Sequence, residues 1–389
     1  MSRRIRSLEE LTLYAEQLEA ERRAAAPIVR AILDAPYANF TRPRPEWINL
    51  GMAEELGAAA HEVCSRSPEK SAALALMAVD VALELDESYA RVNRYQVLAH
   101  GYIELANALR FQGDYQQALD ALDHADAALE DAMGLPREEA ISILARATTL
   151  ADMAHTKEAL DLVPEAAVRF AELGDTARVA QCDLLRGIIH HRIGRPGTAA
   201  GAYRAALQQA RMAGHQPTVA RTHMNLGILA ADNGRVREAM DALEQAQAIL
   251  SDDGTADLAR GRRDIGIALL SAEKAADAIP LLREAWLEFH RLRVPAEARL
   301  AGLGLAEGYL ALGRQTVARY LIGKVLQESG DSRADEHVLV ALRYLAKLPH
   351  PTRAEVKHVR SYLIRTRTEP HLPFALRNFS ARRRAAELT

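Results

Sequence analysis

Aromatic residues are scarce in this chain of 389 residues, since phenylalanine, tryptophan and tyrosine together make up only 5%. Domains built on β-sheets usually need more large rings in their cores, so this composition argues against several such domains. The two cysteines, Cys64 and Cys182, cannot form a disulfide framework and match none of the paired spacings of zinc sites. We therefore expect a protein of the reducing cytoplasm that holds no metal and no other cofactor.

Long apolar runs and a strong excess of one charge are also missing. No stretch of 18 apolar residues occurs, and the N-terminal residues 1–23 lack the apolar core of a secretory signal. The net charge of −3 does not provide the strong positive field of a dedicated nucleic-acid binder. We expect neither membrane insertion nor direct binding to nucleic acid. Only six of the 49 basic residues are lysine, a bias that we attribute to a GC-rich bacterial genome.

Alanine, in contrast, is abundant and recurs at regular intervals. It supplies 74 residues, about 19% of the chain, and a period of about 40 residues repeats six times. In each repeat a small residue is followed twelve residues later by alanine, and seven residues further on by a second alanine or, once, by valine. In chain order these positions are Ala106, Ala118 and Ala125; Ala147, Ala159 and Ala166; Gly187, Ala199 and Ala206; Gly227, Ala239 and Ala246; Gly266, Ala278 and Ala285; and Ala306, Ala318 and Val325. The chain is therefore predicted to be an array of repeats.

Each repeat is predicted to contain two helices separated by a short turn. In the fourth repeat Val236, Ala239, Met240 and Leu243 begin an apolar series with the spacing of one helix face. Glycine, which ends helices readily in a left-handed conformation, marks the turn in four repeats. These glycines are Gly113, Gly194, Gly234 and Gly313, whereas Ala154 and Glu273 break the pattern. We predict an all-α fold in which helical hairpins stack into an α-solenoid.

The repeats resemble the tetratricopeptide repeat (TPR) family over about residues 97 to 330. The fourth repeat, NLGILAADNGRVREAMDALEQAQAIL, matches the family pattern at Leu226, Gly227, Gly234, Ala239 and Ala246. The first matches at Leu105, Ala106, Gly113, Ala118 and Ala125, and the sixth has the aromatic residue of the family, Tyr309. The second and third depart from the pattern, with Arg146 and Arg186 where the family has leucine. The resemblance implies a right-handed superhelix of antiparallel helical hairpins.

The length of the repeat points to a subtype of this family. A period of about 40 residues exceeds the usual 34. It is similar to the longer repeats of kinesin light chain, of bacterial quorum-peptide receptors and of the sensor regions of large bacterial transcription regulators. That subtype usually binds peptides or proteins, which implies a protein or an extended peptide as the partner.

Four segments follow from this pattern. Residues 1–46 are predicted to form an N-terminal helical segment and a proline-containing linker, and residues 47–96 a degenerate capping hairpin. Residues 97–335 hold the six TPR-like repeats, and residues 336–389 hold C-terminal helices and a basic tail. The arginines of this tail allow two interpretations. They contact phosphates or an acidic partner, or they serve only to keep the chain in solution. They are Arg377, Arg382, Arg383 and Arg384.

Candidate ligand contacts follow from the resemblance, because the first helix of each TPR hairpin lines the concave face of the superhelix. Polar residues at such positions are His100, Asn107, Arg110, His191, Arg192, Arg221, Asn225, Arg260, Arg263 and Glu307. The densest part lies in the third to fifth repeats, where the arginine forks of Arg221, Arg260 and Arg263 would hold a carboxylate and Asn225 would pair with a peptide backbone. The alternative is that this group is an ordinary solvated face.

Motifs for catalysis or metal binding are absent from the sequence. The adjacent His190 and His191 would point about 100° apart on a helix, so they cannot bind one metal as an i, i+4 pair does. Cys182 is predicted to be a buried structural cysteine, and neither HExxH, GxSxG nor GxGxxG occurs. We therefore expect no enzymatic activity.

Two functional hypotheses remain. In the first, the protein is a non-enzymatic adaptor or sensor that binds a peptide or protein on its concave face, in bacterial signalling or transcriptional regulation. In the second, it is a structural scaffold subunit of a multi-protein assembly that docks through its ends and its basic tail. The first rests on the family resemblance.

Overall fold

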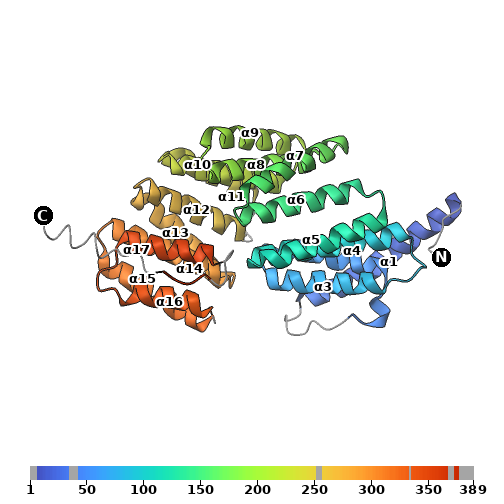
Figure 1. The fold of residues 1–389 in the computed structure, drawn as a ribbon, viewed down its shortest axis with the longest axis horizontal. Coiled ribbons are helices and arrows are strands. Elements are labelled where there is room, and N and C mark those ends of the chain that lie inside the picture. The colour runs from blue at the N-terminus through green and yellow to red at the C-terminus, as the bar shows by residue number, and fades with distance from the viewer. Residues whose placement is uncertain (1–6, 35–42, 251–255, 333, 367–371, 376–389) are drawn as a thin grey trace. The chain divides into compact units, whose positions relative to one another are not determined.

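The computed structural model describes residues 7–34, 43–250, 256–332, 334–366 and 372–375. In these residues the chain forms 17 α-helices and one short 3-10 helix, without a β-strand (Figure 1). Consecutive helices pack as hairpins, so the predicted all-α architecture is confirmed. No helix of the described part has both the length and the apolar character that crossing a membrane requires.

The six repeats each contribute a first and a second helix. The first helices are α4 (Arg91–Gln112), α6 (Pro136–Asp152), α8 (Thr176–Arg192), α10 (Gln216–Asp232), α12 (Ala256–Ser271) and α14 (Pro295–Ala311). The second helices are α5 (Tyr115–Ala132), α7 (Thr156–Glu172), α9 (Pro196–Met212), α11 (Val236–Ile249), α13 (Ala275–Arg291) and α15 (Gln315–Asp331).

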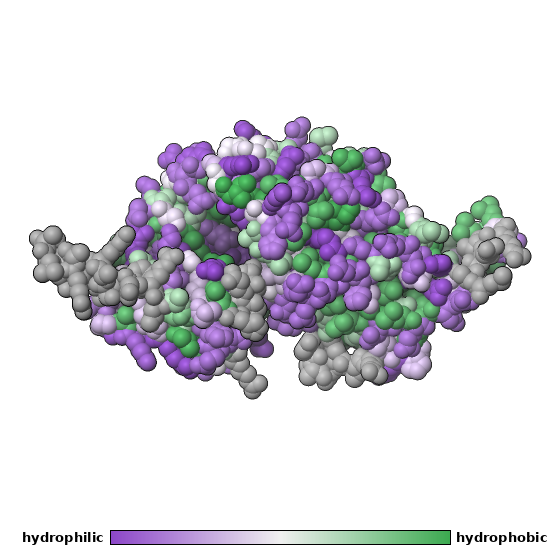
Figure 2. Space-filling model, viewed as in Figure 1, coloured by the Kyte–Doolittle hydropathy of each residue, from purple (hydrophilic) through white to green (hydrophobic). Residues whose placement is uncertain are grey.

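The helices group into two compact units. Unit 1 comprises residues 1–195 and 208–214, and unit 2 comprises residues 196–207 and 215–389. The division passes through α9, inside the stretch that the sequence predicts to be one array of repeats. Figure 2 shows hydrophobic patches interrupted by hydrophilic side chains on the visible face of both units.

Small residues at the repeat positions form the core of each hairpin. All eleven periodic alanines of the second helices are fully buried, and Val325 is 1% exposed. The small residues of the first helices allow the two helices of a repeat to approach closely. A Cβ atom at Gly266 would come within 2.7 Å of the Leu282 side chain on the second helix of the same repeat. The periodic alanines of the sequence therefore form the packing surface between paired helices.

All six turns inside the repeats contain a left-handed residue within two positions of the end of the first helix. The four glycines Gly113, Gly194, Gly234 and Gly313 have φ between 68° and 93°. Ala154 (φ 63°) and Glu273 (φ 60°) adopt the same conformation although they carry a Cβ atom. In the second repeat the His155 amide donates a hydrogen bond of 2.9 Å to the Leu150 carbonyl. This is the 6→1 hydrogen bond typical of a helix that ends in a left-handed residue. The two exceptions in the sequence therefore change the residue but not the turn.

Three helices precede the repeats in unit 1: a single long helix and a helical hairpin. Helix α1 (Leu8–Asp34) packs against α2 (Leu50–Val63), which pairs with α3 (Pro68–Glu84), and the short 3-10 helix spans Pro45–Trp47. The Glu21 carboxylate of α1 accepts a hydrogen bond from the Leu50 amide at the start of α2 (3.2 Å) and another from the Tyr89 hydroxyl (2.9 Å). One acidic side chain thus ties α1 to the start of α2 and to the segment that follows α3.

The C-terminal helices do not repeat the preceding pattern. Helix α16 (Glu336–Lys347) packs on the second helix α15, whereas α17 (Arg353–Arg365) contacts the first helix α14 (Figure 1). A capping box between Thr352 and Glu355 fixes the start of α17. Helix α17 therefore takes the place beside α14 that the first helix of a seventh repeat would occupy.

Candidate functional site

The first helices contact one another in sequence and form a row in each unit. In unit 1 the row consists of α2, α4, α6 and α8, and in unit 2 of α10, α12, α14 and α17. We call these surfaces the first-helix rows. All ten ligand contacts predicted from the sequence lie on their helices.

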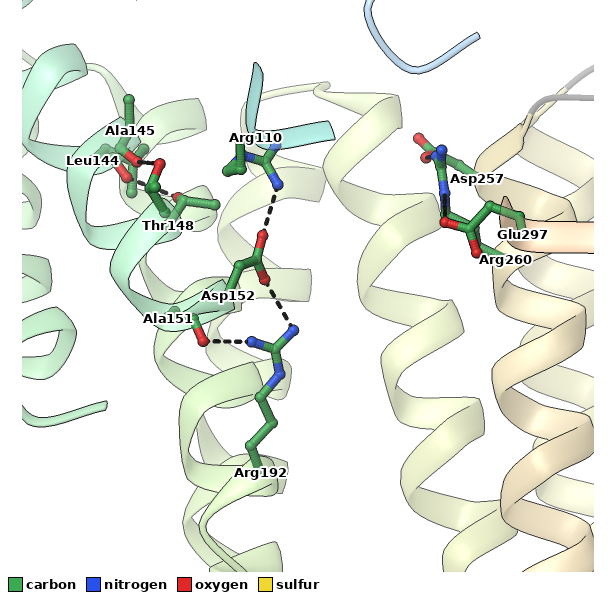
Figure 3. Close-up of polar contacts among 11 residues, drawn as sticks. Arg110, Leu144, Ala145, Thr148, Ala151, Asp152, Arg192, Asp257, Arg260 and Glu297 are labelled. Atoms are coloured by element: carbon green, nitrogen blue, oxygen red, sulfur yellow. Dashed lines mark hydrogen bonds and ion pairs between the residues drawn. The ribbon is translucent and has the colours of Figure 1, made fainter. Parts of the chain in front are cut away.

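The row of unit 2 carries a continuous ionic network across three repeats. Asp257 on α12 accepts from Arg221 on α10 (3.1 Å) and from Arg260 on its own helix (3.0 Å). Arg260 reaches Glu297 on α14 at 3.6 Å, and Arg263 forms a second ion pair with the same Glu297. Figure 3 shows the Asp257, Arg260 and Glu297 side chains pointing toward one another. Three guanidinium groups therefore share Asp257 and Glu297, and Arg263 pairs in addition with Asp264 at 2.8 Å.

Solvent exposure differs within this network. The side chains of Arg260 and Arg263 are 18% and 11% exposed, so both are largely shielded from solvent. Arg221 is 50% exposed and remains accessible. Burial disfavours ionisation of Asp257, but the attraction of Arg221 and Arg260 outweighs it and holds the pKa of this carboxyl below its usual value. Asp257 is therefore ionised at neutral pH.

Asn225 lies one helical turn after Arg221 on α10. Its side-chain amide donates to the Arg221 carbonyl at 2.9 Å. Asn225 is half-buried, so the amide is held against the helix beside an accessible guanidinium group. Arg221 and Asn225 are thus two of the predicted contacts that lie next to each other at the surface of unit 2.

The row of unit 1 carries a smaller ionic cluster at the C-terminal ends of its helices. Asp152 on α6 accepts from Arg110 on α4 (2.9 Å) and from Arg192 on α8 (3.1 Å), as Figure 3 shows. Arg192 also donates to the Ala151 carbonyl at 2.8 Å, and the Arg110 guanidinium lies 4.4 Å from the centroid of the Phe111 ring. Two guanidinium groups share one carboxylate, which leaves this cluster with a net charge of about +1.

A buried carboxylate that the sequence did not reveal organises the remaining candidates of unit 1. Glu104 on α4 accepts from His61 on α2 at 3.1 Å and from Asn107 at 3.4 Å. Burial works against ionisation, but His61 and the nearby His100 outweigh it, so the pKa of Glu104 is lowered. His100 also fills the space beside Gly57, where a Cβ atom would lie 2.8 Å from its ring. Asn107 and His100 therefore support Glu104, and His191 lies apart on the last turn of α8.

Glu307 has a different environment from the one predicted. It is buried beneath α17 and paired with Arg360, so a ligand would reach it only if α17 moved. The four tail arginines, Arg377, Arg382, Arg383 and Arg384, lie outside the described residues.

The acidic partners were missed by sequence reasoning, although a signal for them exists. Arg110 precedes Asp152 by 42 residues, Arg221 precedes Asp257 by 36, and Arg137 precedes Asp175 by 38. Each spacing is close to one repeat, so an arginine followed one period later by an acid predicts an ion pair between neighbouring first helices.

The described residues contain no group of three or more histidine, cysteine and acidic side chains placed to hold a metal. Cys182 is buried, as predicted, and burial together with Asp183 raises the pKa of its thiol to about 12. A cavity of about 680 Å³ beside α6 and α7 is lined by Pro136, Pro164, Val168 and neighbouring residues. None of the predicted contacts lines it.

Comparison with known proteins supports the fold. No family model and no curated protein matches the chain. Among solved structures, a Rap protein complexed with competence and sporulation factor is similar at 12% identity, with 82% of this chain and 88% of that chain covered and a TM-score of 0.57. The Rap conjugation gene regulator of plasmid pLS20 in complex with a peptide is similar at 13% identity, 84% and 99% coverage and a TM-score of 0.50.

A third similar structure is a signal-transduction ATPase with numerous domains and a tetratricopeptide repeat sensor from Pyrococcus horikoshii. It is 12% identical, with 95% of this chain and 54% of that chain covered and a TM-score of 0.54. At such identities the likeness is one of fold alone. The chain is therefore a TPR-like helical repeat protein, as the repeats predicted.

Proposed function

We propose that this chain is a non-enzymatic adaptor or sensor that binds an extended peptide or protein segment on its first-helix rows, in bacterial signalling or transcriptional regulation. The observation that carries the proposal is the pair Arg221 and Asn225. An accessible guanidinium group and an amide lie one turn apart on α10, and Asp257 holds the guanidinium in place.

The chemistry of this pair suits a peptide. Asp257 accepts from the Nε and Nη2 atoms of Arg221, which leaves the other donors of the guanidinium fork directed elsewhere. A half-exposed arginine with a fixed orientation loses less side-chain entropy when it binds a carboxylate. An asparagine side chain offers a donor and an acceptor, which match the carbonyl and amide of an extended backbone.

The fold likeness gives independent support. Two of the similar structures are complexes, one with competence and sporulation factor and one with a peptide, and each covers more than four fifths of this chain. The second of these structures therefore holds a peptide on a chain of similar fold and comparable extent. The signalling context of the proposal rests on the same analogy.

The experiment selects ligands first and then tests the pair. A display library of random eight-residue peptides is selected on the wild-type protein, and the affinity of the enriched peptides is measured for three proteins. These are the wild type, the double variant Arg221→Ala/Asn225→Ala and the control Arg235→Ala. Arg235 is 51% exposed and paired with Glu238, so it matches Arg221 in exposure but lies at the start of the second helix α11.

Loss of a hydrogen-bonded charge costs about 1.5–3 kcal/mol, so we expect the double variant to bind about tenfold to hundredfold more weakly. The control should bind as the wild type does. Asp257 retains Arg260 in the double variant, so the fold should be preserved. Equal binding by all three proteins would place the interface elsewhere and favour the scaffold hypothesis. Failure to enrich any peptide would refute peptide binding.

A further inference from the structure

The C-terminal strap, which we define as residues Leu372–Ala375, lies across the last two helices of unit 2. Two side chains of α17 donate hydrogen bonds to its backbone. The Tyr362 hydroxyl donates to the Leu372 carbonyl at 2.8 Å, and the His358 Nε2 atom donates to the Ala375 carbonyl at 3.0 Å. The strap has no regular secondary structure of its own, so these contacts are made to an irregular segment.

The Phe374 ring enters a cluster of three rings that we call the aromatic socket. The centroid of the Phe374 ring lies 5.5 Å from that of Tyr344 on α16, 5.6 Å from that of His358 and 4.9 Å from that of Tyr362. The contact with Tyr362 is edge-to-face. These separations are in the favourable range for aromatic pairs. The socket is therefore built by both C-terminal helices and filled by a side chain from outside them.

Burial alternates along the strap. Leu372 and Phe374 are half-buried and pack against the hydrophobic core of unit 2, whereas Pro373 and Ala375 are exposed. A segment with alternate side chains buried is how an extended peptide lies on a protein surface. The side chains of α17 donate to the backbone of the strap, so these hydrogen bonds do not depend on the sequence of the bound segment. Specificity for a sequence comes from the socket, which receives one aromatic ring.

We propose that the aromatic socket is a recognition site for an extended segment of a partner protein with the pattern Leu-X-Phe, and that the strap occupies it as an internal competitor. The strap itself shows the chemistry of the ligand. The socket lies on α16 and α17 and shares no residue with the Arg221–Asn225 pair, so the proposal is independent of the function proposed above.

The attachment of the strap decides how the competition works. Only residues 366–371 separate α17 from the strap, and a short tether gives an effective concentration in the millimolar range. A partner segment must therefore bind the empty socket with a Kd well below this range to displace the strap. Emptying the socket by mutation removes the competitor and should strengthen the binding of an added peptide.

The test uses the full chain and a fluorescein-labelled peptide with the sequence of residues 370–377, PHLPFALR. Anisotropy titrations compare the wild type with Phe374→Ala, and with Phe374→Ala/Tyr362→Phe, which keeps the ring but removes the hydroxyl donor. A second probe, PHLPAALR, lacks the phenylalanine. Circular dichroism and thermal melting establish that each variant is folded, and Phe374→Leu serves as a second, milder variant that retains an apolar contact with the core.

We expect Phe374→Ala to bind PHLPFALR at least about tenfold more tightly than the wild type does. Removal of the Tyr362 hydroxyl should weaken this binding about threefold to tenfold, as loss of one hydrogen bond does. PHLPAALR should not bind. Absence of probe binding to both folded Phe374 variants at 1 mM peptide, or equal binding of the two probes, would overturn the proposal. A concentration-dependent dimer of the wild type that dissociates in Phe374→Ala would show instead that the occupant is the strap of a second copy.

Discussion

Arg360 on α17 and Glu307 on α14 form an ion pair in which each side chain is only 5% exposed. The two residues are 53 positions apart in the chain. A second arginine of α17, Arg353, pairs with Glu273 and donates to the Leu270 carbonyl at 3.0 Å. Two polar attachments therefore fix α17 as the last helix of the first-helix row of unit 2.

Removal of one partner of the buried pair should destabilise the protein strongly. Arg360→Ala leaves the Glu307 carboxylate buried without its cation, and we expect a loss of about 3–5 kcal/mol in the free energy of unfolding. The double variant Glu307→Leu/Arg360→Met replaces both charges by apolar groups of similar size and should be close to the wild type. Urea unfolding of the three proteins measures this. A loss below about 1 kcal/mol for Arg360→Ala would mean that water reaches Glu307.

The two turns without glycine offer a second test. Ala154 has φ 63° in a turn where four other repeats have glycine, and a left-handed conformation costs a residue with a Cβ atom about 1–2 kcal/mol. Glycine removes that strain but adds entropy to the unfolded chain. We therefore expect Ala154→Gly to stabilise the protein by up to about 1 kcal/mol, and Gly194→Ala to destabilise it by about the same amount. Stabilisation by Gly194→Ala would show that the turn tolerates a side chain, and thermal melting gives the sign of each change.

The repeat architecture was predictable because its determinants are local and periodic. Small residues recur wherever two paired helices approach, as at Gly266 beside Leu282, and a turn recurs at the same place in every repeat. The turn at Ala154 shows why periodicity was a better guide than residue type. The backbone hydrogen bonds of the turn impose the geometry even where glycine is missing.

The candidate site was less predictable because its contacts link distant positions. The sequence indicated Arg260 and Arg263 as surface residues, but it did not reveal that Glu297 on the next first helix forms ion pairs with both of them. Glu307 has the register of a first-helix residue, yet α17 buries it. No repeat pattern predicts that placement, because α17 departs from the alternation of first and second helices.

The ionic network of unit 2 should make stability depend on pH in the acidic range. The pKa of Asp257 is lowered in the folded protein, so its contribution is complete above its unfolded-state pKa and is lost as the pH falls through its folded-state pKa. Asp257→Asn removes the charge. The difference in stability between the wild type and Asp257→Asn should be constant above about pH 5 and should shrink below about pH 4. Hydrogen exchange of the α12 amides measures this difference in stability locally. A difference that grew on acidification would contradict the prediction.

The Cys182 thiol should be inert in the folded protein. It is fully buried, and its pKa of about 12 leaves almost no thiolate at pH 8. A Cys64→Ser variant isolates this thiol, and its reaction with a disulfide reagent can be compared with that of a free cysteine. We expect a rate at least about a thousandfold slower, because the reagent must wait for local unfolding of α8. Denaturant should restore the full rate. Reaction within about tenfold of free cysteine in the native state would show that α8 opens readily, and Cys182 would then be a reactive site rather than part of the core.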